Sequence, residues 1–200
     1  VATNKVVVGV SYSEPVSALE RSVILTPKFA STIMSVLSQA KETVEVLFDD
    51  RNIKLSTTEH FVYGKLVEAQ YVPYHIALSN SVNTIVTVQT EEFLKAIDRV
   101  MLFCPVMNNI LQIQVLVGKV SISAEDLDFN FSAEEEVVCD NKEGSGAFLC
   151  NARFLYEIVQ RVKSPTLEIS FSDTTPTVYF NPVGVEEDYT YVLLKYIRFN

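Results

Sequence analysis

The chain has 200 residues, of which 48% are hydrophobic and 20% are charged, and its formal net charge is −9 at pH 7. This composition is typical of one or two globular domains with a sizeable core, and no apolar run approaches the ~20 residues that a membrane-spanning helix needs. The acidic balance excludes a uniformly basic nucleic-acid-binding protein, but not one that gathers its Lys and Arg residues on one face.

The N-terminal stretch, residues 1–12, is rich in Val and is predicted to be one strand. No earlier segment is visible that could pair with it, and no signal peptide is visible either. We therefore expect this strand to be the last of a preceding unit, so that the chain begins in the middle of a domain. A Val-rich strand needs a sheet, because an unpaired edge invites association. Residues 13–20 are predicted to be a polar connector.

From residue 21 onward, one order of elements recurs three times with a period of roughly sixty residues: a short strand, an amphipathic helix, then three strands. The first copy is predicted to have a strand at 22–25, a helix at 27–39 and strands at 43–48, 53–58 and 61–69. The second has a strand at 84–88, a helix at 91–103 and strands at 111–116, 119–124 and 129–139. The third has a strand at 147–150, a helix at 152–162 and strands at 166–172, 177–181 and 189–199.

The start of each predicted helix carries a similar signal. Thr26-Pro27, Thr90 and Asn151 stand where a side chain can accept hydrogen bonds from the first free N–H groups of a helix. The best boundary between the copies is 79–82, which divides the chain into domains 1–80 and 81–200. The sequence thus predicts an α+β fold of repeated βαβββ units, with helices on one face of antiparallel sheets. Such a fold points to a scaffold rather than to a catalytic pocket.

Each predicted helix has an apolar side, which should seat it on a sheet, and a polar side. At least one Lys or Arg recurs on the polar side in all three copies of an otherwise acidic chain. The residues are Lys28 in the first helix, Lys95 and Arg99 in the second, and Arg153 and Lys163 in and after the third. A polar helix face is most often simply solvated. The recurrence of basic residues is what favours a functional interpretation.

The sequence has few residue patterns that are typical of catalytic or metal-binding sites. His60 and His75 lie far apart and beside no residue at metal-ligand spacing. Cys104, Cys139 and Cys150 are an odd set without C-x-x-C spacing, so buried free thiols in a reducing cytosol are the simplest interpretation. No nucleophile–base set is apparent. We therefore expect no catalytic residue, no metal and no cofactor.

Several short motifs, in order and spacing, resemble one family. They are Val1-Ala2-Thr3-Asn4, Phe93-Leu94-Lys95-Ala96, the stretch 120–129 (VSISAEDLDF) and Ser132-Ala133-Glu134-Glu135. This pattern resembles the bacterial sliding clamp, the β subunit of DNA polymerase III, and particularly that of the Bacteroidetes. The resemblance covers essentially the whole chain, as the second half of the clamp's middle domain (1–80) and a complete C-terminal domain (81–200). It implies the DNA-clamp fold, in which helices line a central hole.

The resemblance implies a cytoplasmic, non-catalytic processivity factor that forms a homodimeric ring around duplex DNA. Its helices would face the DNA across water, so that Lys28, Lys95, Arg99, Arg153 and Lys163 contact phosphates without reading bases. It also implies a groove in which the replicative polymerase and the clamp loader dock linear peptides. Carried over by position, the groove residues are Thr3, Val8, Val72, Ala77, Asn151, Phe154, Thr175, Thr177, Leu193, Leu194, Tyr196, Ile197 and Arg198.

The groove departs from the family pattern near the C-terminus, where the family's Met-Pro-Met-Arg reads Lys195-Tyr196-Ile197-Arg198. The resemblance further implies a subunit contact that combines the apolar pair Leu102 and Phe103 with nearby acidic residues. Those residues are Glu125, Asp126, Asp128 and Glu134. For Leu102 and Phe103, ordinary core packing is an equal alternative. For the whole chain, the alternative is a divergent clamp-like interaction module that lacks standard partner docking.

Overall fold

The structure is a computed structural model that describes residues 1–13, 22–40, 43–186 and 189–196. Its contacts divide the chain into a small unit, Pro15–Pro73, and a large unit made of Val1–Glu14 and Tyr74–Asn200. This grouping assigns the first strands to the C-terminal part of the chain. The division at residue 80 that the sequence suggested places them in domain 1–80, together with the first repeat.

The small unit packs one helix against a three-stranded sheet of order β3-β4-β5. The elements are α1 (Pro27–Leu37), β3 (Glu45–Phe48), β4 (Asn52–Ser56) and β5 (Phe61–Lys65). Thr26 caps α1 as expected, because its Oγ1 accepts from the Phe29 N–H at 3.3 Å. The strand predicted at 22–25 is not formed. In its place, Ile24 contributes one backbone bond, accepting from the Val67 N–H at 2.9 Å.

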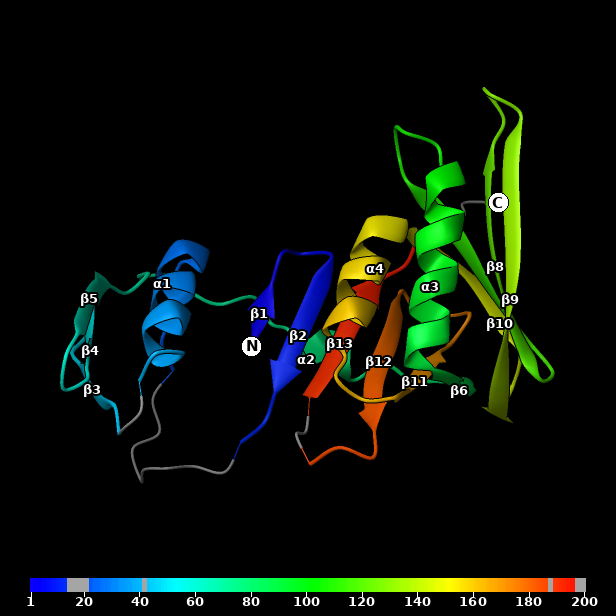
Figure 1. Ribbon diagram of the computed structural model, residues 1–200. Coiled ribbons are helices and arrows are strands. Elements are labelled where there is room, and N and C mark those ends of the chain that lie inside the picture. The colour runs from blue at the N-terminus through cyan, green and yellow to red at the C-terminus, as the bar shows by residue number, and fades with distance from the viewer. Residues whose placement is uncertain (14–21, 41–42, 187–188, 197–200) are drawn as a thin grey trace. The chain divides into compact units, whose positions relative to one another are not determined.

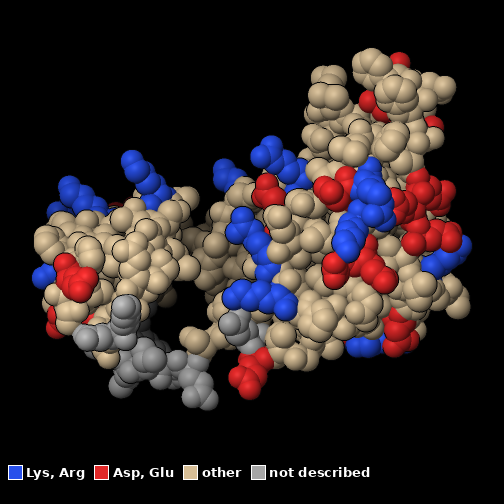
Figure 2. Space-filling model, in the orientation of Figure 1, with Lys and Arg blue, Asp and Glu red and all other residues tan. Residues whose placement is uncertain are grey.

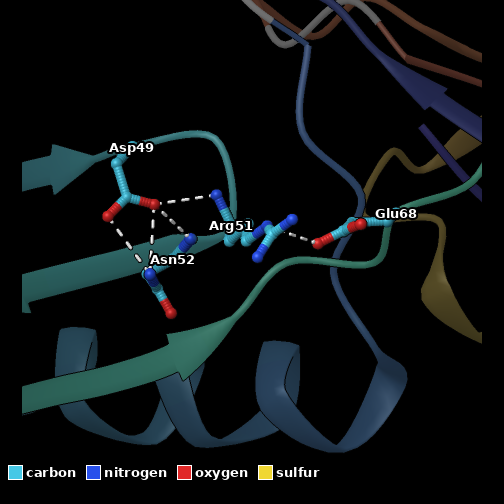
Figure 3. A network of polar contacts seen from close by, with 4 residues as sticks. All are labelled: Asp49, Arg51, Asn52 and Glu68. Carbon is cyan, nitrogen blue, oxygen red and sulfur yellow. Dashed lines mark hydrogen bonds and ion pairs between the residues drawn. The ribbon is translucent and has the colours of Figure 1, made fainter.

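The turn between β3 and β4 is held by one carboxylate (Figure 3). Asp49 Oδ1 accepts from the backbone N–H groups of Arg51 at 2.8 Å and Asn52 at 2.7 Å. The Arg51 side chain reaches Glu68 at 3.1 Å, beyond the end of β5. Asp and Asn favour turns for this reason, since their short side chains bond to nearby backbone groups.

The large unit contains a ten-stranded sheet of order β1-β2-β13-β12-β11-β6-β9-β8-β7-β10 (Figure 1). Its strands are β1 (Ala2–Thr3), β2 (Val7–Ser11), β6 (Thr84–Gln89), β7 (Ile110–Leu116), β8 (Lys119–Asp126), β9 (Phe131–Glu143), β10 (Gly146–Asn151), β11 (Thr166–Phe171), β12 (Thr177–Val183) and β13 (Tyr189–Leu194). Its helices are α2 (His75–Leu78), α3 (Thr90–Val100), the 3-10 turn η1 (Met101–Phe103) and α4 (Ala152–Arg161).

Two βαβββ halves repeat within this unit: β6-α3-β7-β8-β9 and β10-α4-β11-β12-β13. They interlock, because the first strand of each half pairs antiparallel with the second strand of the other, β6 with β11 and β10 with β7. The helices α3 and α4 pack side by side (Figure 1). The predicted βαβββ repeat and the antiparallel sheets are confirmed for these two copies.

The core of the large unit lies between these helices and the sheet. Phe93, Ile97, Leu155 and Val159 are fully buried, as the apolar helix sides predicted. Along β7, buried Leu111, Ile113 and Val115 alternate with less buried residues, so this sheet has one face on the core and one face outward. Burial of each helix face contributes several kcal/mol, at ~25 cal/mol per Å² of apolar area.

The expectation of one strand over residues 1–12 is wrong. The chain turns back at Lys5, whose φ is +78°, and β1 pairs with β2. Asn4 Oδ1 accepts from the Val7 N–H at 2.7 Å and holds this turn. The Val-rich β2 does find a sheet, since it pairs antiparallel with β13.

Candidate functional site

The basic residues of the predicted DNA-facing set all lie on exposed helix positions or next to them. Lys28 is on α1 of the small unit, Lys95 and Arg99 are on α3, Arg153 is on α4, and Lys163 follows α4; all five are exposed. On α3 and α4 they stand on the side away from the buried core residues. The separation of polar and apolar helix sides is therefore as the sequence predicted.

Glutamates offset part of this positive charge, which the sequence pattern did not reveal. Over α3, basic side chains lie between acidic ones (Figure 2). The ion pairs are Lys95 Nζ to Glu91 Oε1 at 2.6 Å, Arg99 Nη2 to Glu135 Oε2 at 2.5 Å, and Arg153 Nε to Glu157 Oε1 at 3.3 Å. Within the described residues, Lys28 and Lys163 form no ion pair, so they carry the least compensated charge of the set.

The Arg99–Glu135 pair joins α3 to β9 across 36 residues of sequence. Both oxygens of Glu135 accept from the guanidinium, a geometry that Arg favours with carboxylates. The hydrogen bond from Arg99 lowers the pKa of Glu135, so this carboxylate stays charged at neutral pH.

Several predicted groove residues share one face of the sheet. Val8 pairs with Val192 and Thr177 with Leu194, and residues directly opposite in a ladder lie on the same side. This face is opposite to the helices, because the intervening Leu193 is fully buried in the core beneath them. The groove was expected to include Leu193 and Thr177, but Leu193 is fully buried and Thr177 is 1% exposed, so neither offers a surface to a ligand.

The α2 segment borders this face. Tyr179 Oη donates to the carbonyl of Ala77 at 2.7 Å, and Asn80 Nδ2 donates to Thr177 Oγ1 at 2.8 Å. Ala77 is thereby brought close to the buried Thr177. Thr3 lies at the β1–β2 hairpin, where its Oγ1 donates to the carbonyl of Val7 at 2.9 Å.

Other members of the predicted groove lie elsewhere. Phe154 on α4 is partly buried against the core. Val72 belongs to the small unit. Ile197 and Arg198 lie outside the described residues.

Next to the groove face is a hollow of about 340 Å³ that includes two predicted residues, Thr175 and Tyr196. Its other walls, which sequence reasoning did not identify, are Gln112, residues 147–149, residues 173–174, Pro176 and Lys195. Lys195 is anchored there, since its Nζ donates to the carbonyl of Ser172 at 2.5 Å. Burial lowers the pKa of Lys195, and nearby Asp173 acts in the opposite direction.

Asn151 serves as the N-cap of α4. Its Oδ1 accepts from the N–H groups of Arg153 at 3.1 Å and Phe154 at 3.3 Å, and its Nδ2 donates to the carbonyl of Asn108 at 3.2 Å. The capping expected at this residue is confirmed. Any groove role of Asn151 would be additional to this structural one.

Replacement of Asn151 by Ala should lower the free energy of unfolding by about 1 kcal/mol, because the first N–H groups of α4 lose their acceptor. Asn151→Asp is the matched control, since it keeps an acceptor oxygen and should retain most of the stability. Urea unfolding monitored by circular dichroism measures both. Equal stability losses in the two variants would contradict the capping role.

The apolar pair proposed for the subunit contact is exposed. Leu102 is 80% exposed and Phe103 is 39% exposed, so core packing does not account for them. Val106 and Met107 extend the same exposed segment after η1. Phe129 and Phe131, stacked at 6.2 Å between ring centroids, add exposed apolar surface at the β8–β9 corner.

Of the four acidic residues, Glu125, Asp128 and Glu134 are exposed. Asp126 is 7% exposed and accepts from the N–H groups of Asp128 and Phe129, so it holds the corner. The strand beside them has a free edge. Among the described residues, the part of β9 from Phe131 to Val138 pairs with β8 alone, whereas the part from Cys139 to Glu143 pairs with β6.

The cysteines are free thiols, as expected. Burial raises the pKa of Cys104 to about 11 and raises that of Cys150 as well, so both remain protonated at neutral pH. Among the described residues, no group of His, Cys, Asp and Glu could hold a metal ion. None of the described helices has the length and apolar character to span a membrane.

A comparison with protein families decides the assignment. The family described as "DNA polymerase III beta subunit, C-terminal domain" matches residues 76–196. The chain belongs to this family. The match covers both βαβββ halves of the large unit, so the resemblance to the beta subunit drawn from the sequence motifs is confirmed.

Curated relatives agree with the beta-subunit assignment. The chain is 23% identical to the beta sliding clamp of Caulobacter vibrioides over 175 residues, covering 86% of this chain and 46% of the relative. It is 20% identical to the beta sliding clamp of Pseudomonas putida over 185 residues, covering 92% and 50%. The chain thus spans about half the length of the curated relatives it matches.

Solved structures confirm the clamp fold. The DNA polymerase III beta subunit of Thermotoga maritima superposes with a TM-score of 0.91 at 20% identity, covering 100% of this chain and 54% of that one. A sliding clamp from Pseudomonas aeruginosa bound to griselimycin gives a TM-score of 0.91 at 18% identity, covering 98% and 53%. At these identities the likeness establishes the fold, and the α+β clamp prediction is correct.

Proposed function

We propose that the protein, in its full length, is a sliding clamp: a non-catalytic ring that encircles duplex DNA and tethers the replicative polymerase. The observation that carries this proposal is the beta-subunit match over residues 76–196, together with the exposed basic sides of α3 and α4. The site of action would be the cytoplasm, where bacterial chromosomes are replicated.

The DNA-facing surface would bind DNA solely through attraction between its basic side chains and the phosphates. Lys28, Lys95, Arg99, Arg153 and Lys163 are exposed on or beside helices, and long basic side chains on helices reach phosphates without contacting base edges. The glutamate partners of three of them weaken the attraction. Weak, screened contacts suit a ring that slides, because tight contacts would hold it at one place.

Domain organisation supports a longer protein. We propose that residues 1–80 are the second half of a middle domain and residues 81–200 a C-terminal domain. In the large unit, the second strand of each half pairs with the first strand of its sister half. The corresponding strand β3 pairs with β4 alone among the described strands, and its Val46 and Leu47 are exposed. A sister half of the same fold would cover this edge.

The subunit contact is proposed for the free edge of β9 and the apolar residues near it. Within the chain, β13 occupies the place in its half that β9 occupies in the other, and β13 already accepts β2 along its outer edge. A strand of a second copy would pair with the outer edge of β9 in the same way. Leu102 and Phe103 would then be covered, with Glu125, Asp128 and Glu134 at the rim.

The peptide groove is proposed for the face that carries Val8, Ala77 and Leu194, continuing into the hollow beside Thr175 and Tyr196. Its partners would be linear peptides of the polymerase and of the clamp loader. An extended peptide fits such a surface, because neighbouring pockets can each take one apolar side chain.

Retention on circular DNA tests the proposal that the protein encircles DNA as a ring. The full-length protein, loaded onto nicked circular plasmid by its clamp loader, should co-elute with the plasmid in gel filtration. Cutting the plasmid once with a restriction enzyme should release it, because a ring slides off an end. Equal retention on circular and linear DNA would contradict encirclement, since it would indicate ordinary surface binding.

A further inference from the structure

The three-stranded sheet of the small unit has its helix on one face (Figure 1). On that face, Ile53 and Leu55 are buried in the cluster that includes Ile33 of α1, and a Cβ added at Gly64 would lie 2.4 Å from the ring of Phe29. Successive residues of a strand point to opposite faces. The face away from α1 therefore carries four exposed side chains of β4 and β5, which are Lys54, Phe61, Tyr63 and Lys65.

Two aromatic rings lie on this outer sheet face. Phe61 is 71% exposed and Tyr63 is 60% exposed, and they are two positions apart on β5. Tyr63 stands directly opposite Lys54, which in turn stands opposite the exposed Leu47 of β3. Exposed rings at neighbouring positions of a sheet can each stack against one nucleobase.

The same face carries two uncompensated ammonium groups. Within the described residues, neither Lys54 nor Lys65 forms an ion pair. The Lys54 Nζ lies 5.7 Å from the centroid of the Phe61 ring, so positive charge and aromatic surface are adjacent. The acidic residues of this face are on β3 and its turn. Glu45 lies two strands away from Phe61, and Asp49 binds backbone N–H groups of the turn.

The large unit shows that the βαβββ fold does not require such a surface. Strand β9 has the place in its half that β5 has in the small unit. On the face of β9 away from the core, Ser132, Glu134 and Glu136 occupy alternate positions. The nearby Lys119 is paired with Glu136. The combination of aromatic rings and unpaired lysines is therefore particular to the small unit.

We propose that the outer sheet face of the small unit binds single-stranded DNA, with bases stacked on Phe61 and Tyr63 and phosphates held by Lys54 and Lys65. A single strand suits this face better than a duplex, because its bases can turn toward the rings. It suits the face better than an apolar peptide, because unpaired ammonium groups flank the rings and attract phosphates.

This inference goes beyond the proposed ring. In that ring the sheets form the outer wall, so a single strand would be held outside the hole that contains the duplex. The choice of DNA over RNA rests on the proposed role in replication. Stacking and phosphate contacts themselves do not depend on that role, and so binding by this face and encirclement of DNA can be tested separately.

Fluorescence anisotropy of labelled (dT)15 tests the proposal on the purified full-length protein at low salt. Phe61→Ala and Tyr63→Ala should each weaken binding at least about fivefold, the lower end of the effect of losing one stacked base. Tyr63→Phe should retain binding, because its ring remains. Lys54→Gln and Lys65→Gln should each reduce the slope of log affinity against log salt by about 0.7.

Controls separate this face from the rest of the protein. Tyr12→Ala removes an exposed aromatic ring of the large unit and should leave (dT)15 binding unchanged. Lys142→Gln should do the same, because Lys142 is already paired with Glu168. Phe61→Ala and Tyr63→Ala should leave the affinity for a 15-base-pair duplex unchanged. Thermal unfolding verifies the fold of each variant.

Four results would overturn the proposal. The first is (dT)15 binding that is absent or insensitive to Phe61→Ala and Tyr63→Ala. The second is an equal loss of duplex binding in these variants, which would remove the selectivity for single strands. The third is tighter binding of (rU)15, which would contradict the choice of DNA. The fourth is a larger assembly in sedimentation velocity that these variants abolish without oligonucleotide binding, which would assign the face to a second copy.

Discussion

Replacement of Gly144 by Ala should lower the free energy of unfolding by about 3 kcal/mol, the combined cost of backbone strain and steric overlap. Gly144 has a φ of +68°, which other residues rarely adopt. A Cβ added there would lie 2.1 Å from the backbone oxygen of Asn83, immediately before β6. Backbone cannot give way as a flexible side chain can, so the β9–β10 turn would have to separate from β6.

Gly118→Ala provides the control for this prediction. Gly118 also has a positive φ, +77°, but a Cβ there would meet no atom within 4 Å. Its replacement should cost about 1 kcal/mol, the price of the left-handed conformation alone. Urea unfolding of both variants gives the comparison. Equal losses would contradict the prediction, because they would show that the close contact with the backbone of Asn83 adds nothing to the cost of the substitution.

Neutralising Lys28 and Lys163 together should weaken binding of duplex DNA roughly 50-fold at 0.1 M salt, if each contacts one phosphate. These two residues form no ion pair among the described residues, so their charge is the most available to DNA. The slope of log affinity against log salt should become shallower by about 1.8, or ~0.9 for each lost contact. Fluorescence anisotropy of Lys28→Gln/Lys163→Gln across a salt series measures both quantities.

The matched control removes a basic residue together with its partner. Glu91→Gln/Lys95→Gln deletes an ion pair of 2.6 Å and leaves the net charge unchanged. Its DNA affinity should stay within about twofold of the unmodified protein, because exposed pairs present little net charge. A loss as large as that of the Lys28/Lys163 variant would contradict the view that the glutamates offset the basic helix faces.

Local features of the fold were predictable because they depend on neighbouring residues. The apolar spacing of Phe93 and Ile97, or of Leu155 and Val159, marks the buried side of a helix wherever that helix packs. Capping by Thr26 and Asn151 likewise follows from adjacent residues. Thr90 is the exception: it is the first residue of α3, with Gln89 at the cap position, and its Oγ1 is buried without a hydrogen-bond partner. There, the backbone bond from Thr90 to Pro165 fixes the start of the helix.

Features that depend on distant residues were not predictable. No residue pattern near Arg99 predicts its pairing with Glu135, which lies 36 residues later in the sequence, on β9. The pairing of β2 with β13 joins opposite ends of the chain, and no local pattern encodes that register. The hollow at Lys195 lies where β10 meets the chain after β13 at the single bridge Leu149–Tyr196 among the described residues. The basic and groove residues could be named from family resemblance, but the Arg99–Glu135 pair and the burial of Leu193 required the structure.

The central claim is that the helices face DNA while the sheets form the outer wall, and photo-cross-linking tests it most directly. Gln160 is exposed on α4, and Gln114 is exposed on β7 on the face away from the core. Each is replaced in turn by benzoylphenylalanine, and the full-length protein is loaded onto nicked circular DNA and irradiated. Cross-links to DNA from position 160 and not from position 114 are the expected result. Cross-links from position 114 at an equal or higher yield would contradict the claim.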